Sequence, residues 1–181
     1  MPNRMLSRKS KVAHGLVLGL LATLGAQTPA AAQVTTVSAT TLRAVKGVRS
    51  TVNTVSFGIS FTNVPGATAT FTVPPSTTDL FIVRFSAESV CWGGAGWGVV
   101  RILINGVEMD PAVGTDFAFD STNAGAENAT SYESHSMERS KVITNTTTAP
   151  LTVTVQVQYR ITNTGVFLRL DDWHLTGQQF N

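Results

Sequence analysis

The densest group of chemically active side chains in this sequence is Asp171-Asp172-Trp173-His174, close to the C-terminal end. Neighbouring residues of a β-strand point to opposite faces, so the two carboxylates act together only if a β-bulge shifts the alternation. The apolar residues predict such a bulge, because Leu168 and Leu170 share one parity whereas Trp173 and Leu175 share the other. The bulge would turn Asp171 and Asp172 toward one cation, and calcium prefers carboxylate oxygens as ligands.

A structural role for these carboxylates is the alternative. One aspartate then pairs with an arginine such as Arg101 or Arg169, or accepts hydrogen bonds from backbone N–H groups. Trp173 and His174 belong to the same cluster and are candidate ligand-binding residues in either case.

A second candidate site is the pair Glu133 and His135, with Glu138 nearby. Alternate residues of a strand share one face, so this pair can supply acid–base chemistry or two ligands for a transition metal. No third ligand stands at a recognisable spacing, and solvated surface residues are the alternative interpretation. His174 can join His135 only through the fold.

The third candidate is the glycine-rich loop Cys91–Gly98, which carries Trp92 and Trp97. Exposed tryptophans stack on sugar rings and anchor protein interfaces, whereas buried ones would close one end of the fold. No helical pattern follows the glycines, so the loop is not a phosphate-binding loop. Cys91 is the only cysteine and cannot form an intramolecular disulfide; its apolar neighbours favour burial, and an intermolecular bond is the alternative.

Enzymatic interpretations find little support in the motifs. The sequence contains no Gly-x-Ser-x-Gly, no His-Glu-x-x-His and no nucleotide-binding motif. A glycoside hydrolase needs two converging carboxylates, and no spacing among the eleven acidic residues singles out a pair.

The first 32 residues have the three parts of a secretory signal peptide. A basic start with four lysines and arginines precedes an apolar segment from Val12 to about Leu24, and Ala30-Ala31-Ala32 offers the small residues that signal peptidase recognises. The apolar segment is shorter than the ~20 residues of a membrane span. We therefore expect a secreted, extracellular or periplasmic protein with no membrane span after cleavage.

Removing the signal changes the charge argument. Residues 1–32 hold four positive charges and no acids, so the formal net charge of +2 becomes −2 for the remaining 149 residues. A basic balance that would suggest nucleic acid as a partner is therefore absent. A chain of this length suits one domain and buries enough surface to fold without a disulfide or metal.

The remaining chain alternates apolar and polar residues with period two, which predicts antiparallel strands with one buried face. The expected strands lie at 55–62, 67–73, 79–90, 99–104, 107–109, 137–143, 151–162 and 166–175, with a short one near Phe117 and Phe119 and a long surface loop over 120–134. Val64-Pro65-Gly66 and Asn163-Thr164-Gly165 predict turns, and Asn105-Gly106 predicts a type I′ hairpin. Residues 33–53 read as an N-terminal arm or an edge strand.

These patterns predict an all-β fold: a single-domain antiparallel β-sandwich of jelly-roll type over residues 54–181. Many strands in one short domain favour a jelly roll over an immunoglobulin-type sandwich, and the missing Cys…Trp…Cys pattern agrees.

The strand order from Ala67 onward resembles the jelly rolls of tumour necrosis factor and the complement-collagen globular heads, which implies trimers that bind partners through loops. The segment Leu170-Asp171-Asp172-Trp173 is also similar to the final strand of galactose-binding-like carbohydrate-binding modules. Both resemblances concern architecture and carry function only weakly.

Five segments resemble a group of exported bacterial proteins without an assigned function, over roughly Ala67 to Leu175. They are Phe85-Ser86-Ala87-Glu88-Ser89, Val100-Arg101-Ile102-Leu103, Phe117-Ala118-Phe119-Asp120-Ser121, Glu133-Ser134-His135-Ser136-Met137 and Leu168–Leu175. The resemblance implies a second cysteine after the Gly-Trp of the loop, where this chain has Gly98, so a disulfide across the loop is absent here.

Three functional hypotheses follow. The first is a secreted, non-enzymatic module that binds an extracellular partner or surface, as a homotrimer if the resemblance holds. The second is a carbohydrate-binding, lectin-like domain that binds a glycan through Trp92 and Trp97, with calcium at Asp171 and Asp172. The third is an extracellular hydrolase.

Overall fold

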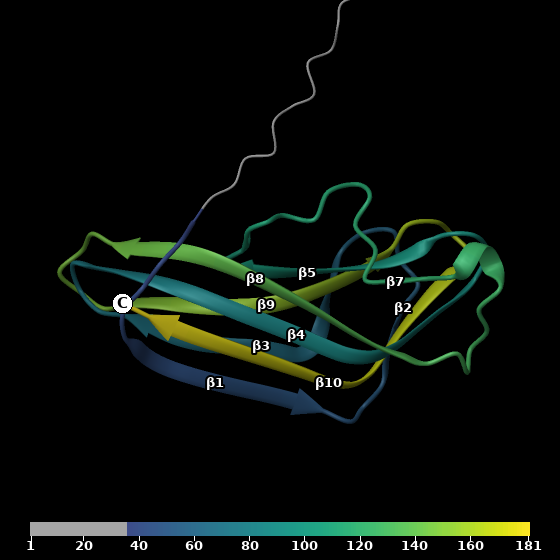
Figure 1. Ribbon diagram of the computed structural model, residues 1–181, viewed down its shortest axis with the longest axis horizontal. Coiled ribbons are helices and arrows are strands. Elements are labelled where there is room, and N and C mark those ends of the chain that lie inside the picture. The colour runs from purple at the N-terminus through teal and green to yellow at the C-terminus, as the bar shows by residue number, and fades with distance from the viewer. Residues whose placement is uncertain (1–35) are drawn as a thin grey trace, which may run out of the picture. The chain divides into compact units, whose positions relative to one another are not determined.

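The computed structural model describes residues 36–181 as two antiparallel β-sheets packed face to face (Figure 1). The predicted signal peptide, residues 1–32, lies outside the described residues. No helix in the described part of the chain is long and apolar enough to cross a membrane.

Sheet A has the order β1 (Leu42–Ser50), β10 (Val166–Phe180), β4 (Thr77–Gly93) and β8 (Glu133–Asn145), and the short β2 (Thr54–Ser56) also pairs with β10. Sheet B has the order β3 (Thr62–Val73), β9 (Leu151–Ile161), β5 (Trp97–Ile104) and β6 (Val107–Glu108), and β7 (Asp120–Ser121) pairs with β5. A 3₁₀ turn, η1 (Asn123–Gly125), follows β7.

The connectivity is that of a jelly roll. The chain moves from sheet A to sheet B after β2 and then changes sheet after β3, β4, β7, β8 and β9, so that the first long strand lies beside the last. Nested Greek-key connections of this kind define the double-sheet jelly roll. The predicted all-β jelly-roll sandwich is therefore confirmed.

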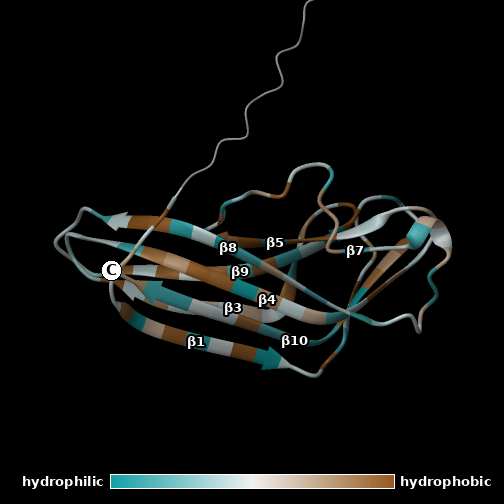
Figure 2. Ribbon diagram, viewed as in Figure 1, coloured by the Kyte–Doolittle hydropathy of each residue, from teal (hydrophilic) through white to brown (hydrophobic). Residues whose placement is uncertain are grey.

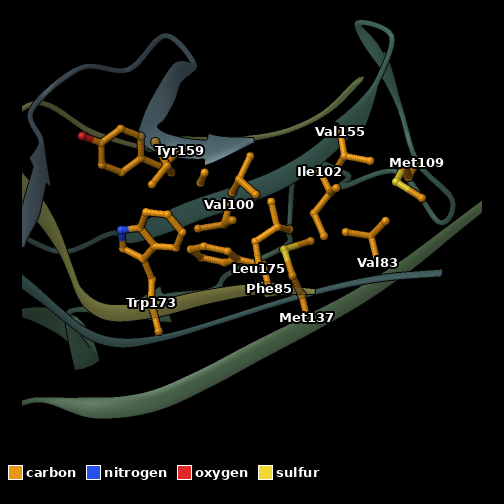
Figure 3. Close-up of a cluster of buried hydrophobic side chains, with 14 of the residues drawn as sticks. Val83, Phe85, Val100, Ile102, Met109, Met137, Val155, Tyr159, Trp173 and Leu175 are labelled. Carbon is orange, nitrogen blue, oxygen red and sulfur yellow. The ribbon is translucent and has the colours of Figure 1, made fainter. Parts of the chain in front are cut away.

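The space between the sheets holds one apolar core. Along most of β3, β4, β9 and β10, buried apolar residues alternate with more exposed ones, and the ribbons in Figure 2 change colour along their length. Phe85 and Leu175 from sheet A face Val100 and Ile102 from sheet B, and Trp173 closes the cluster (Figure 3). All five are at most 2% exposed.

Two glycines let the sheets approach closely. A Cβ added at Gly98 of β5 would lie 2.6 Å from Leu168 of β10, and one added at Gly177 of β10 would lie 2.6 Å from Phe71 of β3. Each large side chain thus fills the space that the glycine of the opposite sheet leaves open, which is the close packing expected of a protein interior.

The predicted β-bulge in β10 is confirmed. Asp171 lies opposite Glu88 of β4 and His174 opposite Ser86, so three steps along β10 match two along β4. Asp172 is the extra residue and has a φ of 42°. Leu170 faces the core before the bulge and Trp173 faces it after the bulge, because the inserted residue shifts the alternation by one position.

The Asn105-Gly106 hairpin is also as predicted, with φ angles of 48° and 79° that suit a type I′ turn between β5 and β6. Residues Leu42–Ser50 form an edge strand of sheet A. A buried polar cluster ties this edge to the centre of the sheet: Asp79 of β4, which is 0% exposed, accepts hydrogen bonds from Arg43 at 3.1 Å and Gln179 at 2.5 Å.

The expected strand over 55–62 is largely wrong. Only Thr54–Ser56 pairs with β10, and the chain then leaves sheet A and crosses to sheet B, where β3 begins at Thr62. Phe57 and Ile59 belong to the apolar face that this strand was expected to bury, but they are 67% and 54% exposed.

The expected turn at Val64-Pro65-Gly66 is an irregularity within β3. Asn63 pairs with Gln158 and Thr68 with Gln156, so the intervening residues of β3 have no partners in register on β9. Gly66 has a φ of 75°.

The other expected segments differ mainly in their bounds. The short strand expected at Phe117 and Phe119 lies at Asp120–Ser121, and β8 begins at Glu133, four residues before the expected start. β10 continues to Phe180, five residues beyond Leu175.

Deleting Asp172 should abolish the native fold. Without the extra residue, Trp173 and Leu175 would face outward, and exposing each such side chain costs roughly 1.5–3 kcal/mol. Urea denaturation of the deletion variant should show no cooperative transition. Deleting Gly114, which lies in an exposed loop with nothing within 4 Å of its added Cβ, is the control and should unfold like the parent. A cooperative, parent-like transition after deletion of Asp172 would contradict this account of the bulge.

Candidate functional site

The most distinctive surface of the protein is an aromatic patch on the outer face of sheet A, formed by Phe57, Trp92 and Phe167. Phe167 of β10 lies directly opposite Trp92 of β4. Their rings stack with centroids 5.2 Å apart and planes at 19°. Phe57 meets Phe167 edge-on, with centroids 5.7 Å apart at 84°. The patch therefore crosses from the loop after β2 over β10 to β4.

Arg169 and Tyr132 border the aromatic patch. The Arg169 guanidinium lies 5.2 Å from the centre of the Trp92 ring, and its Nη1 donates a hydrogen bond of 2.7 Å to the Tyr132 hydroxyl. Phe167 and Arg169, two residues apart on β10, are thus both packed against the Trp92 indole. Protein side chains therefore cover part of the indole surface that would stack on a sugar ring.

The backbone of residues 57–61 is held in place by sheet B. The Ile161 amide donates to the Gly58 carbonyl at 3.0 Å, and Arg160 donates to the Ile59 carbonyl at 3.4 Å. The Phe61 ring is flanked by the guanidinium groups of Arg101, at 3.8 Å, and Arg160, at 4.9 Å. Phe57 and Ile59 are thus displayed to solvent by an anchored segment.

The glycine-rich loop is packed between two neighbouring loops. On one side, Gly96 exchanges hydrogen bonds with the side chain of Thr122, at 3.1 and 3.0 Å. On the other side, the Gly94 amide donates to the Gly165 carbonyl at 3.0 Å, and Asn163 donates to the Ala95 carbonyl at 2.9 Å. The glycines serve close packing, since a Cβ at Gly93 would lie 2.1 Å from the Gly165 carbonyl oxygen.

The structure separates the two loop tryptophans. Trp92 is adjacent to the core residue Cys91 and points to the outer face of sheet A. Trp97 is adjacent to Gly98, whose missing side chain faces the core, and so points to the outer face of sheet B. Both indoles are half-buried. They cannot form one sugar-binding surface, as the sequence had suggested.

Cys91 faces the core and is 1% exposed. Burial, and secondarily the negative charge of Asp120, raise the pKa of its thiol to about 12, against a smaller opposing effect of a hydrogen bond with the Gly98 backbone. The thiol is therefore protonated and inaccessible at neutral pH, which agrees with the expected burial.

The cluster at the bulge does not gather as a site. Trp173 is 2% exposed and packs near Phe85, so its ring is not available to a ligand. His174 points to the outer face of sheet A, with Nε2 3.3 Å from the Thr176 hydroxyl. Asp171 accepts a hydrogen bond of 3.0 Å from the Asp172 amide, which matches the backbone N–H alternative. The two arginines proposed as partners bind elsewhere: Arg101 contacts Gln158 and Glu108, and Arg169 contacts Tyr132.

Calcium would have to rely on Asp171 and Asp172 alone at this point. Within residues 36–181, no three or more histidine, cysteine, aspartate or glutamate side chains converge to hold a metal ion. Calcium takes six to eight oxygen ligands, so two adjacent aspartates are a small part of the set it needs.

Glu133 and His135 lie in a hydrogen-bonded chain that the sequence did not reveal. His135 Nδ1 lies 2.9 Å from the Ser89 hydroxyl, which lies 2.8 Å from a carboxylate oxygen of Asp120. Glu133 lies 3.6 Å from His135 Nε2. Asp120, Glu133 and His135 border a polar cavity of about 380 Å³ whose lining also includes Glu127.

The order of these hydrogen bonds differs from that of a nucleophilic triad, because Ser89 lies between His135 and Asp120. The Ser89 hydroxyl is fully buried and has only one proton, which the carboxylate of Asp120 accepts. It cannot reach a substrate, and the arrangement braces the start of β8 against β4. His135 precedes the core residue Met137 by two positions, whereas His174 points outward, so the two histidines lie on opposite faces of sheet A.

Several residues of these sites were missed from the sequence. Phe57 and Ile59 were assigned to the core because they alternate, and Phe167 and Tyr132 had no signal of their own. Ser89 and Asp120 stand 46 and 15 residues from His135 along the chain, so no local spacing relates them.

No family model matches the chain, and no curated protein matches it. Among solved structures, the dimeric latent form of PorU from Porphyromonas gingivalis is similar over 80% of this chain, with 14% sequence identity and a TM-score of 0.33. The chain spans 14% of the length of that protein.

The packing of the glycine-rich loop gives a prediction for two neighbouring glycines. Gly93→Ala should be destabilising by several kcal/mol, because the residue has a φ of 108° and the new Cβ would overlap the Gly165 carbonyl. Gly94→Ala should be nearly neutral, since nothing lies within 4 Å of its Cβ. Thermal melts of both variants decide the point: equal melting temperatures would show that the loop is not packed as described.

Proposed function

We propose that the chain is an exported, non-enzymatic binding module that contacts an extracellular protein through the aromatic patch. The observation that carries this proposal is the exposure of Phe57, a member of the patch, on a segment that sheet B holds in place. A mobile loop could fold such side chains away from water, but this one is fixed by three separate contacts.

The composition of the patch supports a protein partner. Residues that dominate the binding energy of protein interfaces are enriched in tryptophan, tyrosine and arginine, which here are Trp92, Tyr132 and Arg169. Burying a phenylalanine or isoleucine under a partner contributes roughly 1.5–3 kcal/mol. A glycan at Trp92 has less support, because Phe167 and Arg169 already pack on the indole.

The aromatic patch lies at the opposite end of the sandwich from the pairing of Thr40 with Asn181, which suits a module that presents one end to a partner. Thr40 and Asn181 pair through their backbones, with the Thr40 amide donating to the Asn181 carbonyl at 2.7 Å. This pairing lies beyond Phe180 at one end of β10, and Phe167 stands near the other end. About 13 residues of strand, or roughly 40 Å, separate the two.

The non-enzymatic part of the proposal has separate support. The one histidine–serine–carboxylate constellation in the described chain has its hydroxyl buried at 0% exposure. Its hydrogen bonds are satisfied within the protein. A structural role, the connection of β4 and β8, therefore accounts for these residues, and no substrate is needed to explain them.

Site-specific photo-cross-linking tests the patch. A photoreactive phenylalanine analogue at position 57, in the chain exported by its native cell, should give one discrete adduct with another protein. Val107 is the matched control, because it is 58% exposed and lies on the β5–β6 hairpin of sheet B. Adducts at both positions, or at neither, would refute the proposal.

The homotrimer implied by the jelly-roll resemblance is part of the same proposal. An apolar row of Leu42, Phe180, Leu80 and Val142 crosses the four long strands of sheet A near the paired ends, and Leu42 and Val142 are 49% and 45% exposed. Light scattering should give three times the protomer mass, and Val142→Asp should lower it. A protomer mass at high concentration would contradict the trimer.

A further inference from the structure

A polar trough runs along β4 on the outer face of sheet A, on the far side of the bulge from the aromatic patch. Its volume is about 390 Å³, within the size range of small-molecule sites. Its lining includes Arg84 and Ser86 of β4, Glu138 of β8, and His174, Thr176 and Gln178 of β10. Three adjacent strands thus contribute side chains to one elongated surface.

Most of these side chains have no partner within the protein. Arg84 and Glu138 lie directly opposite each other on β4 and β8, where opposite charges commonly pair. Nevertheless, neither side chain makes a hydrogen bond or an ion pair with any other part of residues 36–181, and the same holds for Gln178. By contrast, Arg101 and Gln158 on the outer face of sheet B bind each other at 2.6 and 2.9 Å.

The charges of the trough balance. One guanidinium and one carboxylate face each other, with an imidazole, an amide and two hydroxyls around them. This set offers strong donors and strong acceptors side by side without favouring a net charge. An anion would meet Glu138 and a cation would meet Arg84, so a neutral ligand with many hydroxyl groups is the best match.

The shape of the trough selects among neutral ligands. Side chains on one face of a strand recur about every 6.6 Å, and neighbouring strands lie about 4.8 Å apart. The groups of the trough therefore form a regular grid along β4, which can contact successive units of an extended polyhydroxylated chain.

We propose that the trough binds a neutral oligosaccharide, with Arg84, Glu138 and Gln178 as its main hydrogen-bonding side chains. This site is separate from the aromatic patch and does not depend on it. The carbohydrate hypothesis for this protein thus moves from the tryptophan loop to the open face of sheet A, where His174 is the one residue of the original set that remains.

The test uses the full exported chain and a glycan array that carries both neutral and acidic oligosaccharides, followed by calorimetric titration with cellohexaose, mannohexaose and chitohexaose. At least one neutral oligosaccharide should bind. Arg84→Ala and Gln178→Ala should each weaken that binding about tenfold or more, because each removes hydrogen bonds to the ligand. Both positions are at the surface, so the variants should melt like the parent.

Thr152→Ala, at an exposed position of β9 in sheet B, is the matched control and should leave binding unchanged. Phe57→Ser should also leave oligosaccharide binding unchanged. The aromatic-patch proposal and the trough proposal can therefore fail independently of each other. Three outcomes overturn the proposal: no neutral oligosaccharide binds, only acidic ones bind, or binding persists in Arg84→Ala. Concentration-dependent association that Arg84→Ala abolishes, without glycan binding, would identify a second copy of the chain as the occupant instead.

Discussion

The pairing of β10 with β4 along the centre of sheet A accommodates one extra residue, Asp172, and the rest of the sandwich depends on this irregularity. Before the bulge, Val166, Leu168 and Leu170 face the core; after it, Trp173, Leu175 and Gly177 do. A regular strand of this length would bury only one of these two sets. The bulge therefore allows one continuous strand to complete the core over its whole length, and it also places Phe167 and His174 on the same outer face.

The sandwich also requires its two sheets to approach each other closely, which a few glycines permit. Gly98 and Gly177 lie on facing sheets, and each accommodates a large side chain from the other, Leu168 and Phe71 respectively. Gly93 does the same for a backbone carbonyl at the end of the sandwich. Gly93 and Gly96 thus allow the loop between the two tryptophans to pack against its neighbours, whereas Gly94 makes no such close contact.

The parts of this structure that the sequence could predict are those governed by local periodicity. The strict alternation of 151–162 gave β9 almost to the residue, and the change of parity between Leu170 and Trp173 revealed the bulge. The same rule failed at Phe57 and Ile59, because alternation cannot show where a chain leaves one sheet for the other. Tertiary structure determines which strand face is covered, and it also brings Ser89 into contact with Asp120 and His135. The sequence does not show which side chains are paired within the protein, and the candidate surfaces depend on that difference.

The position of β10 has a consequence for the order in which the protein can be assembled. It is the last of the described strands along the sequence, yet β1, β2 and β4 all pair with it. Until it emerges, sheet A lacks its central pairing and β1 has no neighbour. Folds dominated by such distant contacts form slowly, because the entropy of closing long loops is lost before the contacts form. Sheet A is therefore completed only after β1, β2 and β4 have all been synthesised and have waited without their shared partner.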